Sequence, residues 1–193
     1  MGIPLEIKPS MTIKGFINSD ENRMELAGNV YHLTYNGNAQ PLITAASNAT
    51  GTVYYKIGEN GTWSTSIPTA TNVGSYKIYY CVAPTDTHTE IKETLIGTAR
   101  ITTATVSITA PTAKTLTYNG SAQALVNAGA TSGGTMKYST SENGTYSTTI
   151  PTGTNAGNYT VWYYVDGGSN FTTTSKQSVP VTIKKVTPSV TAP

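Results

Sequence analysis

The chain has few charged residues, a single cysteine and no long apolar run, and each shortage excludes a class of protein. Charged residues make up 11% of the 193 positions, against about 25% in typical soluble proteins. The net charge is only +2, which argues against a nucleic-acid partner held by a basic stripe. One Cys allows no internal disulfide, and with 2 His it argues against a structural zinc site. No apolar run reaches the roughly 18 residues of a transmembrane helix, so we expect no membrane partner.

Glycine, tyrosine and small hydroxyl residues dominate what remains. The chain has 18 Gly, 10 Pro and 13 Tyr but only 2 Phe, a turn-rich composition typical of β proteins. Aromatic and β-branched residues are too numerous for a disordered chain. The first residues lack both a basic and an apolar region of a secretory signal, so the sequence predicts no secretion by that route.

The sequence contains an internal repeat. The segment Leu33-Thr34-Tyr35-Asn36-Gly37 recurs as Leu116-Thr117-Tyr118-Asn119-Gly120, an offset of 118 − 35 = 83 residues. The offset persists through Glu-Asn-Gly-Thr-aromatic-Ser at 59–64 and 142–147, and through Thr-Asn-x-Gly-x-Tyr at 71–76 and 154–159. Near the ends it becomes 193 − 111 = 82, so one residue is deleted. Such periodicity indicates an array of homologous modules.

The repeat predicts a division of the chain into four parts. Residues 1–30 form an N-terminal segment, 31–110 a first β module and 111–185 a second β module. Residues 186–193 repeat the linker before the second module and predict a linker toward a third. Linkers such as 104–111, with a Pro and β-branched residues, are expected to restrict the hinge between modules.

Each module is expected to be all-β. Alternation is clearest in 75–82, where Tyr76, Ile78, Tyr80 and Val82 are predicted to share one face. The same phase recurs at Tyr159, Val161, Tyr163 and Val165. Asn-Gly pairs, at Gly37, Gly61, Gly120 and Gly144, predict tight turns with positive φ. A module of this size suits a small antiparallel β-sandwich or a related compact β fold.

The three shared blocks, in this order, resemble the MBG-type repeat. That repeat is an immunoglobulin-like β module found in tandem in surface proteins of gut bacteria and in structural proteins of their phages. The resemblance covers about residues 33–183 and excludes residues 1–30. It implies two tandem immunoglobulin-like sandwiches that serve for display, and it supplies no catalytic residues.

The sequence offers no convincing catalytic or metal site. His32 and His88 stand at non-equivalent places and have no obvious supporting carboxylate, so surface histidines are the better interpretation. Cys81 stands where the second module has Tyr164, which favours a packed strand residue over a nucleophile. Asp86, Glu90 and Glu93 match no known calcium-loop spacing. We therefore predict no catalytic residues, no metal, no cofactor and no enzyme activity.

The aromatic residues allow two interpretations. Trp63 and Tyr79 in the first module, with Tyr146 and Trp162 in the second, could form a platform on which sugars stack, since Tyr and Trp combine flat apolar faces with a polar edge. The alternative is that most aromatics fill a thin β core. Because the modules share most of them at equivalent strand positions, the core interpretation is favoured.

The N-terminal segment is the candidate for docking onto a larger assembly. Its first residues alternate as in a strand that could add to a sheet edge, and its apolar content is high. The alternative is a simple cap on the first module. The candidate docking residues are Ile3, Leu5, Ile7, Met11, Ile13, Phe16 and Ile17.

Two functions follow as expectations. The first is a non-enzymatic structural protein on the virion surface of a bacteriophage: an auxiliary capsid, decoration or head-fibre protein. It would dock to the major capsid or another virion protein through residues 1–30 and display its modules outward. The alternative is a fragment of a bacterial cell-surface adhesin or stalk that contacts a host surface or glycan.

Overall fold

The chain is all-β in the part that its computed structural model describes, residues 30–46 and 49–190. These residues contain strands, bridges and turns and no helix. They divide into two compact units, within Met1–Thr103 and Ala104–Pro193. Each unit has more than one sheet and its own apolar core, an arrangement consistent with a β-sandwich. The all-β prediction is therefore confirmed.

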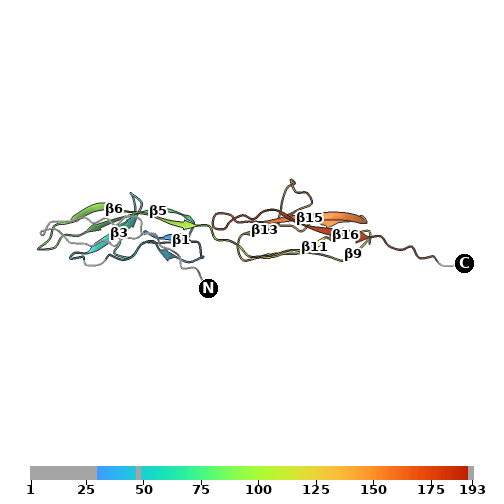
Figure 1. Ribbon diagram of the computed structural model, residues 1–193, viewed down its shortest axis with the longest axis horizontal. Coiled ribbons are helices and arrows are strands. Elements are labelled where there is room, and N and C mark those ends of the chain that lie inside the picture. The colour runs from blue at the N-terminus through green and yellow to red at the C-terminus, as the bar shows by residue number, and fades with distance from the viewer. Residues whose placement is uncertain (1–29, 47–48, 191–193) are drawn as a thin grey trace, which may run out of the picture. The chain divides into compact units, whose positions relative to one another are not determined.

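The first unit contains one four-stranded and one two-stranded sheet (Figure 1). The four-stranded sheet has the order β1-β6-β5-β3, and β2 pairs with β4. Strand β1 is parallel to β6, and the other pairs are antiparallel. The strands are β1 (His32–Thr34), β2 (Gln40–Pro41), β3 (Val53–Ile57), β4 (Thr69–Ala70), β5 (Gly74–Val82) and β6 (Ile91–Thr102).

The second unit has the corresponding sheets in the same order. Its four-stranded sheet is β9-β16-β15-β13, with β9 parallel to β16, and β10 pairs with β14. Two further short pairs, β8 with β11 and β7 with β12, complete it. The strands are β7 (Ile108–Thr109), β8 (Thr112–Ala113), β9 (Leu116–Thr117), β10 (Gln123–Ala124), β11 (Val126–Asn127), β12 (Ala130–Thr131), β13 (Thr135–Ser139), β14 (Thr152–Gly153), β15 (Gly157–Asp166) and β16 (Gln177–Lys184).

A β-bulge accounts for the residue by which the two repeats differ. Ile78 pairs with Gly97 and Tyr79 with Leu95, so Ile96 has no partner on β5. In the second unit, Val161 pairs with Val179 and Trp162 with Ser178 without interruption. The offset between equivalent residues therefore changes from 83 to 82 at this bulge, which inserts one residue and locally twists the strand.

The two apolar cores share no residue. The first contains Leu42, Ile78 and Ile101, and the second contains Leu125, Val161 and Ile183, all at most 2% exposed. The predicted strand faces are confirmed, because the alternating residues are either buried or packed against these cores. Those residues are Tyr76, Ile78, Tyr80 and Val82 in β5, and Tyr159, Val161, Tyr163 and Val165 in β15.

Several tyrosines belong to these cores, as the favoured interpretation of the aromatics expected. Tyr55 and Tyr138, each 4% exposed, occupy equivalent positions in β3 and β13. Their hydroxyls accept hydrogen bonds of 3.0 Å from the backbone N–H groups of Ala46 and Gly129. A buried tyrosine needs such a partner for its polar end.

A hydrogen bond from a tyrosine to the chain four residues earlier recurs in both units. The Tyr76 hydroxyl donates to the Asn72 carbonyl at 2.6 Å, and the Tyr159 hydroxyl donates to the Asn155 carbonyl at 2.7 Å. Both tyrosines end the shared Thr-Asn-x-Gly-x-Tyr block. The block thus closes the turn that leads into β5 or β15.

The Asn-Gly pairs divide into two kinds. Gly37 and Gly120 have φ of 81° and 77°, as predicted. Gly61 and Gly144 do not have positive φ, so that prediction is wrong for them. Glycine is needed there for space, because a Cβ on Gly61 would meet the Ile57 carbonyl, and one on Gly144 would lie 2.8 Å from Ser139 Oγ.

The unit boundaries lie away from the ends of the sequence repeat. Val30 forms a bridge with Ile43, so the first unit includes a residue that the repeat pattern assigned to the N-terminal segment. Ala104 forms a bridge with Phe171, and β7 pairs with β12. The 104–111 segment is therefore part of the second unit's sheets. The candidate docking residues Ile3, Leu5, Ile7, Met11, Ile13, Phe16 and Ile17 lie outside the described residues.

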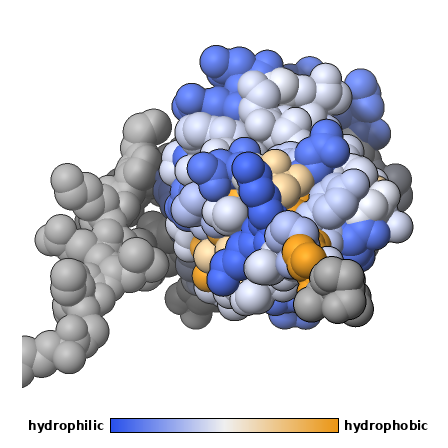
Figure 2. Space-filling model, turned by 90° about the vertical axis from the view of Figure 1, so that its right-hand side faces the viewer, coloured by the Kyte–Doolittle hydropathy of each residue, from blue (hydrophilic) through white to orange (hydrophobic). Residues whose placement is uncertain are grey.

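The surface is mostly polar on the face that Figure 2 shows, where hydrophobic residues form only small separate areas. Large exposed hydrophobic residues in the described ranges are Leu95, Tyr118, Val186 and Val190. Within those ranges, no helix is long and apolar enough to cross a membrane.

Candidate ligand groove

The candidate site lies on the face of the first unit's sheet that points away from the core. Side chains alternate between the two faces of a strand, so the residues between the core positions of β3 and β5 share this outer face. Register places Tyr54 opposite Cys81 and Lys56 opposite Tyr79. The outer face is therefore built from aromatic and lysine side chains.

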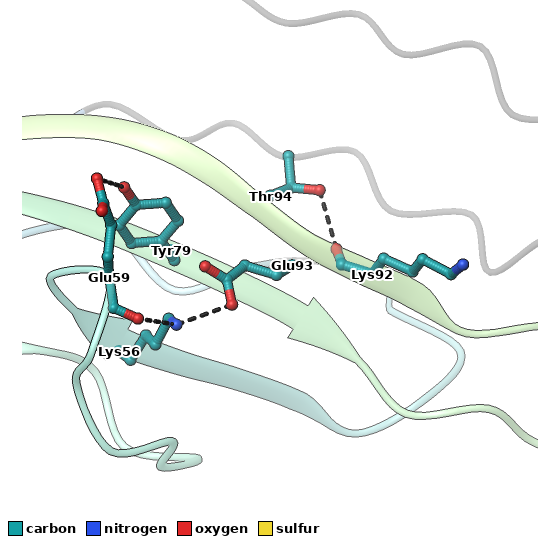
Figure 3. A network of polar contacts seen from close by, with 6 residues as sticks. All are labelled: Lys56, Glu59, Tyr79, Lys92, Glu93 and Thr94. Carbon is teal, nitrogen blue, oxygen red and sulfur yellow. Dashed lines mark hydrogen bonds and ion pairs between the residues drawn. The ribbon is translucent and has the colours of Figure 1, made fainter.

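The Lys56 ammonium group is the centre of this face. Lys56 is only 6% exposed, and its Nζ donates to the Glu59 carbonyl at 2.5 Å and to Glu93 Oε2 at 2.8 Å (Figure 3). The same nitrogen lies 4.8 Å from the ring centroid of Trp63 and 5.4 Å from that of Tyr79. A cation at these distances is attracted by the negative face of an aromatic ring, so Lys56 holds both rings in place.

The Glu59 side chain attaches the adjoining turn to the same face. Its Oε1 accepts a hydrogen bond from the Tyr79 hydroxyl and forms an ion pair with Lys77, each at 3.3 Å. Lys77 and Glu59 are both more than half exposed, so the pair contributes little stability by itself. Its effect is to orient the 58–61 turn that leads to Trp63.

In the second unit an ammonium group takes the same place from a different point of the chain, residue 176, just before β16. Ser139 and Lys176 stand where the first unit has Lys56 and Glu93, by the repeat offset. Lys176 Nζ donates to the Glu142 carbonyl at 2.7 Å and lies 5.3 Å from the Tyr146 centroid. Glu142 and Tyr146 are the counterparts of Glu59 and Trp63. Both units thus have a lysine ammonium over the equivalent aromatic ring, but the lysine stands at a different position of the repeat.

A groove of about 350 Å³ lies beside Trp63 in the first unit. At the corresponding place in the second unit, the rings of Tyr146 and Tyr164 pack edge to face, 5.0 Å apart at 73°. Cys81 replaces Tyr164 in the first unit and leaves the space of that ring open. The groove is open to solvent and is lined by Tyr54, Trp63, Cys81, Glu90, Lys92 and Glu93, among others.

The four predicted stacking residues have different environments in the structure. Trp63 is half-buried and lines the groove. Tyr79 is only 9% exposed and has the Lys56 ammonium over its ring, so its ring face is not accessible to a sugar. Tyr146 is also half-buried, and it packs edge to face against Tyr164 with Lys176 Nζ over its ring. Trp162 is half-buried in β15, where Ser139 and Ser178 are its cross-strand neighbours.

The Cys81 thiol is a weak nucleophile. Partial burial raises its pKa, and the negative charges of Glu93 and Glu90 raise it further against the opposing effect of Lys56. Since the thiolate is the reactive form, a raised pKa lowers the reactive fraction at neutral pH. The contribution of Cys81 to the groove is therefore its small side chain, which leaves space that a tyrosine would fill.

The other candidate chemical groups do not come together. His32 is exposed on β1, and His88 Nδ1 lies 2.8 Å from the Thr87 hydroxyl and 3.4 Å from the Thr85 hydroxyl. Across residues 30–46 and 49–190, no three His, Cys, Asp or Glu side chains are grouped as metal ligands would be. Asp86, Glu90 and Glu93 thus do not form such a group.

An ion pair in the second unit is expected to make the stability of that unit depend on pH. Lys137 Nζ lies 2.6 Å from Asp166 Oδ2, and the hydrogen bonds from Lys137 and from the Gly168 backbone lower the pKa of Asp166 below its usual 3.8. A lowered folded-state pKa stabilises the fold above the unfolded pKa, and that contribution disappears as pH falls through the folded value.

We therefore expect Lys137→Met to raise the pKa of Asp166 toward 3.8, as followed by NMR titration of the carboxyl carbon. The wild-type value should also rise with added salt, because both side chains are partly exposed and salt screens such pairs. An identical Asp166 titration in wild type and variant would contradict the assignment.

The decisive contacts of this site were not predicted from sequence. The repeat aligns Cys81 with Tyr164 and, at the same offset, Lys56 and Glu93 with Ser139 and Lys176, but only the first exchange entered the predictions. That exchange of charge between equivalent positions is visible in the repeat and could have indicated a shared cation. Comparison with models of known protein families found no match, and comparison with curated proteins found no similar sequence.

Proposed function

We propose that the chain is a non-enzymatic structural protein whose two units are immunoglobulin-like modules used for display. The observation that carries this proposal is the tyrosine hydrogen bond found in both units, from Tyr76 to Asn72 and from Tyr159 to Asn155. Immunoglobulin-like sandwiches have a tyrosine corner of this kind, in which a tyrosine near the start of strand F bonds to the chain a few residues upstream.

Strand order supports the same assignment. An immunoglobulin sandwich places strands C, F and G in one sheet and A, B and E in the other. Here β3, β5 and β6 take the places of C, F and G, and β2 and β4 take those of B and E. The bridge of Val30 with Ile43 is the A–B contact. β8 to β16 repeat these pairings, with β8 and β11 as the second A–B contact, and the sequence resembles the MBG-type repeat.

The proposed setting is the surface of a bacteriophage particle. The protein would be an auxiliary capsid, decoration or head-fibre protein, docked to the major capsid or another virion protein by its N-terminal segment. Nearly neutral modules suit this role, because a net charge of only +2 gives no strong attraction to charged partners. The resemblance to repeats of phage structural proteins supports this setting.

Proteomics of gradient-purified phage particles, alongside washed host envelopes, tests the setting. Stoichiometric recovery with the capsid protein is expected. Deleting residues 1–29 should abolish incorporation while both units stay folded. Val30 is retained because it pairs with Ile43 and its methyl groups lie against Gly97. Normal copy number of the shortened protein would refute N-terminal docking.

The second candidate is a bacterial cell-surface adhesin or stalk. The groove beside Trp63 favours it, because an aromatic residue at an open groove suits recognition of a host surface or glycan. Recovery only in the envelope fraction, and not with particles, would select this alternative.

A further inference from the structure

We propose that the groove beside Trp63 is a binding site for a single neutral sugar ring, and that only the first unit has it. This goes beyond the proposed display role and gives a ligand class to the groove that favours the adhesin alternative, while its test does not depend on where the protein is displayed. It follows from four properties of the described residues: an aromatic wall, its fixed position, a balanced set of polar groups, and the Cys81 for Tyr164 exchange.

The aromatic wall is formed by Trp63 and Tyr54. The apolar C–H face of a pyranose packs on a flat ring of this kind, while the polar edge of Trp or Tyr stays available for hydrogen bonds. At about 350 Å³, the groove lies at the small end of the range for small-molecule sites. It therefore suits one sugar ring rather than a folded partner.

The Trp63 ring is held before any ligand arrives. Lys56 lies 4.8 Å from its centroid and is itself held by the Glu59 carbonyl and the Glu93 carboxylate. Ordering a side chain on binding costs free energy, so a ring that is already fixed binds more tightly. The network in Figure 3 is thus the support of the groove wall.

The polar groups favour a neutral ligand. The groove is lined by the carboxylates of Glu90 and Glu93 and the ammonium of Lys92, and Glu93 is also paired with Lys56. Two positive and two negative groups thus lie at or beside the groove, which gives no net attraction for an ion. Carboxylate and ammonium groups can still accept from and donate to sugar hydroxyls.

The exchange of Cys81 and Tyr164 restricts the site to the first unit. In the second unit the edge-to-face contact of Tyr146 and Tyr164 occupies the aromatic surface that a sugar would need. The side chain opposite Tyr164 is Lys137, where the first unit has Tyr54. The second unit therefore lacks both the space and the second aromatic wall.

NMR of the indole N–H groups tests the proposal, because the chain has only 2 Trp, one in each unit. The full chain is titrated with the methyl glycosides of glucose, galactose, mannose and N-acetylglucosamine. The Trp63 signal should shift saturably with at least one of them at millimolar concentration, while the Trp162 signal stays in place. No shift of Trp63 with any of the four would overturn the proposal.

Cys81→Tyr supplies the decisive variant, since it puts into the groove the ring that the second unit already has. It should weaken binding at least tenfold, and Tyr146→Ala, the matched control in the second unit, should leave binding unchanged. Glu90→Gln, a change at an exposed side chain, should weaken binding severalfold and covers the case in which Cys81→Tyr perturbs the fold. Equal affinity in Cys81→Tyr and wild type, or in Glu90→Gln and wild type, would overturn the proposal.

These titrations use the purified chain, so a negative result would leave the proposed display role unaffected. A negative result of the particle experiment would in turn leave the proposed sugar site unaffected.

Discussion

Truncating Leu125 to alanine is expected to destabilise the second unit by about 2–5 kcal/mol, the usual cost of removing a fully buried leucine side chain. Leu125 is 0% exposed and lies in the core with Val126, Val161 and Ile183. A single domain typically has a stability of about 5–15 kcal/mol, so this variant should unfold at clearly lower temperature or denaturant concentration.

The two tryptophans allow the effect to be assigned to one unit. Trp63 lies in the first unit and Trp162 in the second, and each can be followed by fluorescence after the other is replaced by phenylalanine. Because the two cores share no residue, the Leu125→Ala shift should appear only in the Trp162 signal.

Leu42 provides the matched control, since it is the equivalent residue in the first core and is also 0% exposed. Leu42→Ala should shift the Trp63 transition and spare that of Trp162. Equal shifts of both signals in either variant would contradict separate cores and indicate one cooperative unit.

Replacing Glu93 with lysine is expected to cost the first unit about 2 kcal/mol. The Lys56 ammonium is nearly buried and would face a second ammonium in place of its carboxylate partner. Removing the partner of a fully buried charge costs about 3–5 kcal/mol, and the smaller figure reflects the 45% exposure of Glu93 and screening by water.

The double variant Lys56→Ser with Glu93→Lys should restore stability to within about 1 kcal/mol of the wild type. It reproduces the arrangement of Ser139 and Lys176, in which the ammonium of residue 176 reaches the Glu142 carbonyl and the Tyr146 ring. The two changes should therefore be strongly non-additive, as expected for residues in contact.

Urea unfolding, followed by Trp63 fluorescence, measures both variants and the single Lys56→Ser control. If the two losses of stability add, the double variant will be less stable than Glu93→Lys alone. That result would show that an ammonium group over the Trp63 ring is not what stabilises this network. Recovery would show that the fold needs an ammonium group at this place, and that either position 56 or position 93 can supply it.

Several features of the fold could be predicted because they depend on local pattern. Alternation of apolar residues in 75–82 and 158–165 decided which face of each strand is buried, since successive side chains point to opposite faces. The repeat likewise predicted that both halves of the described chain would have the same strands. The repeat also shows that one residue is deleted, but only the structure locates the difference at the bulge at Ile96.

The candidate site could not be predicted in the same way. Lys56 reaches Glu93 across 37 residues, and which side chains meet across strands depends on register. A one-residue change such as the bulge at Ile96 alters that register without altering the local pattern. Trp63 and Tyr146 stand at equivalent positions of the repeat, yet Trp63 lines a groove and Tyr146 packs against the Tyr164 ring.

The amino-acid sequence by itself determined the all-β class, the repeat and the inward faces of the long strands, because these follow from composition and from a period of two along the chain. Only the tertiary structure decided that residues 104–111 pair within the second unit, that a lysine lies over an aromatic ring in both units, and that Cys81 leaves a groove where Tyr164 fills one. Those outcomes depend on which side chains meet after the sheets form, and a small change of side-chain volume or strand register is enough to alter them.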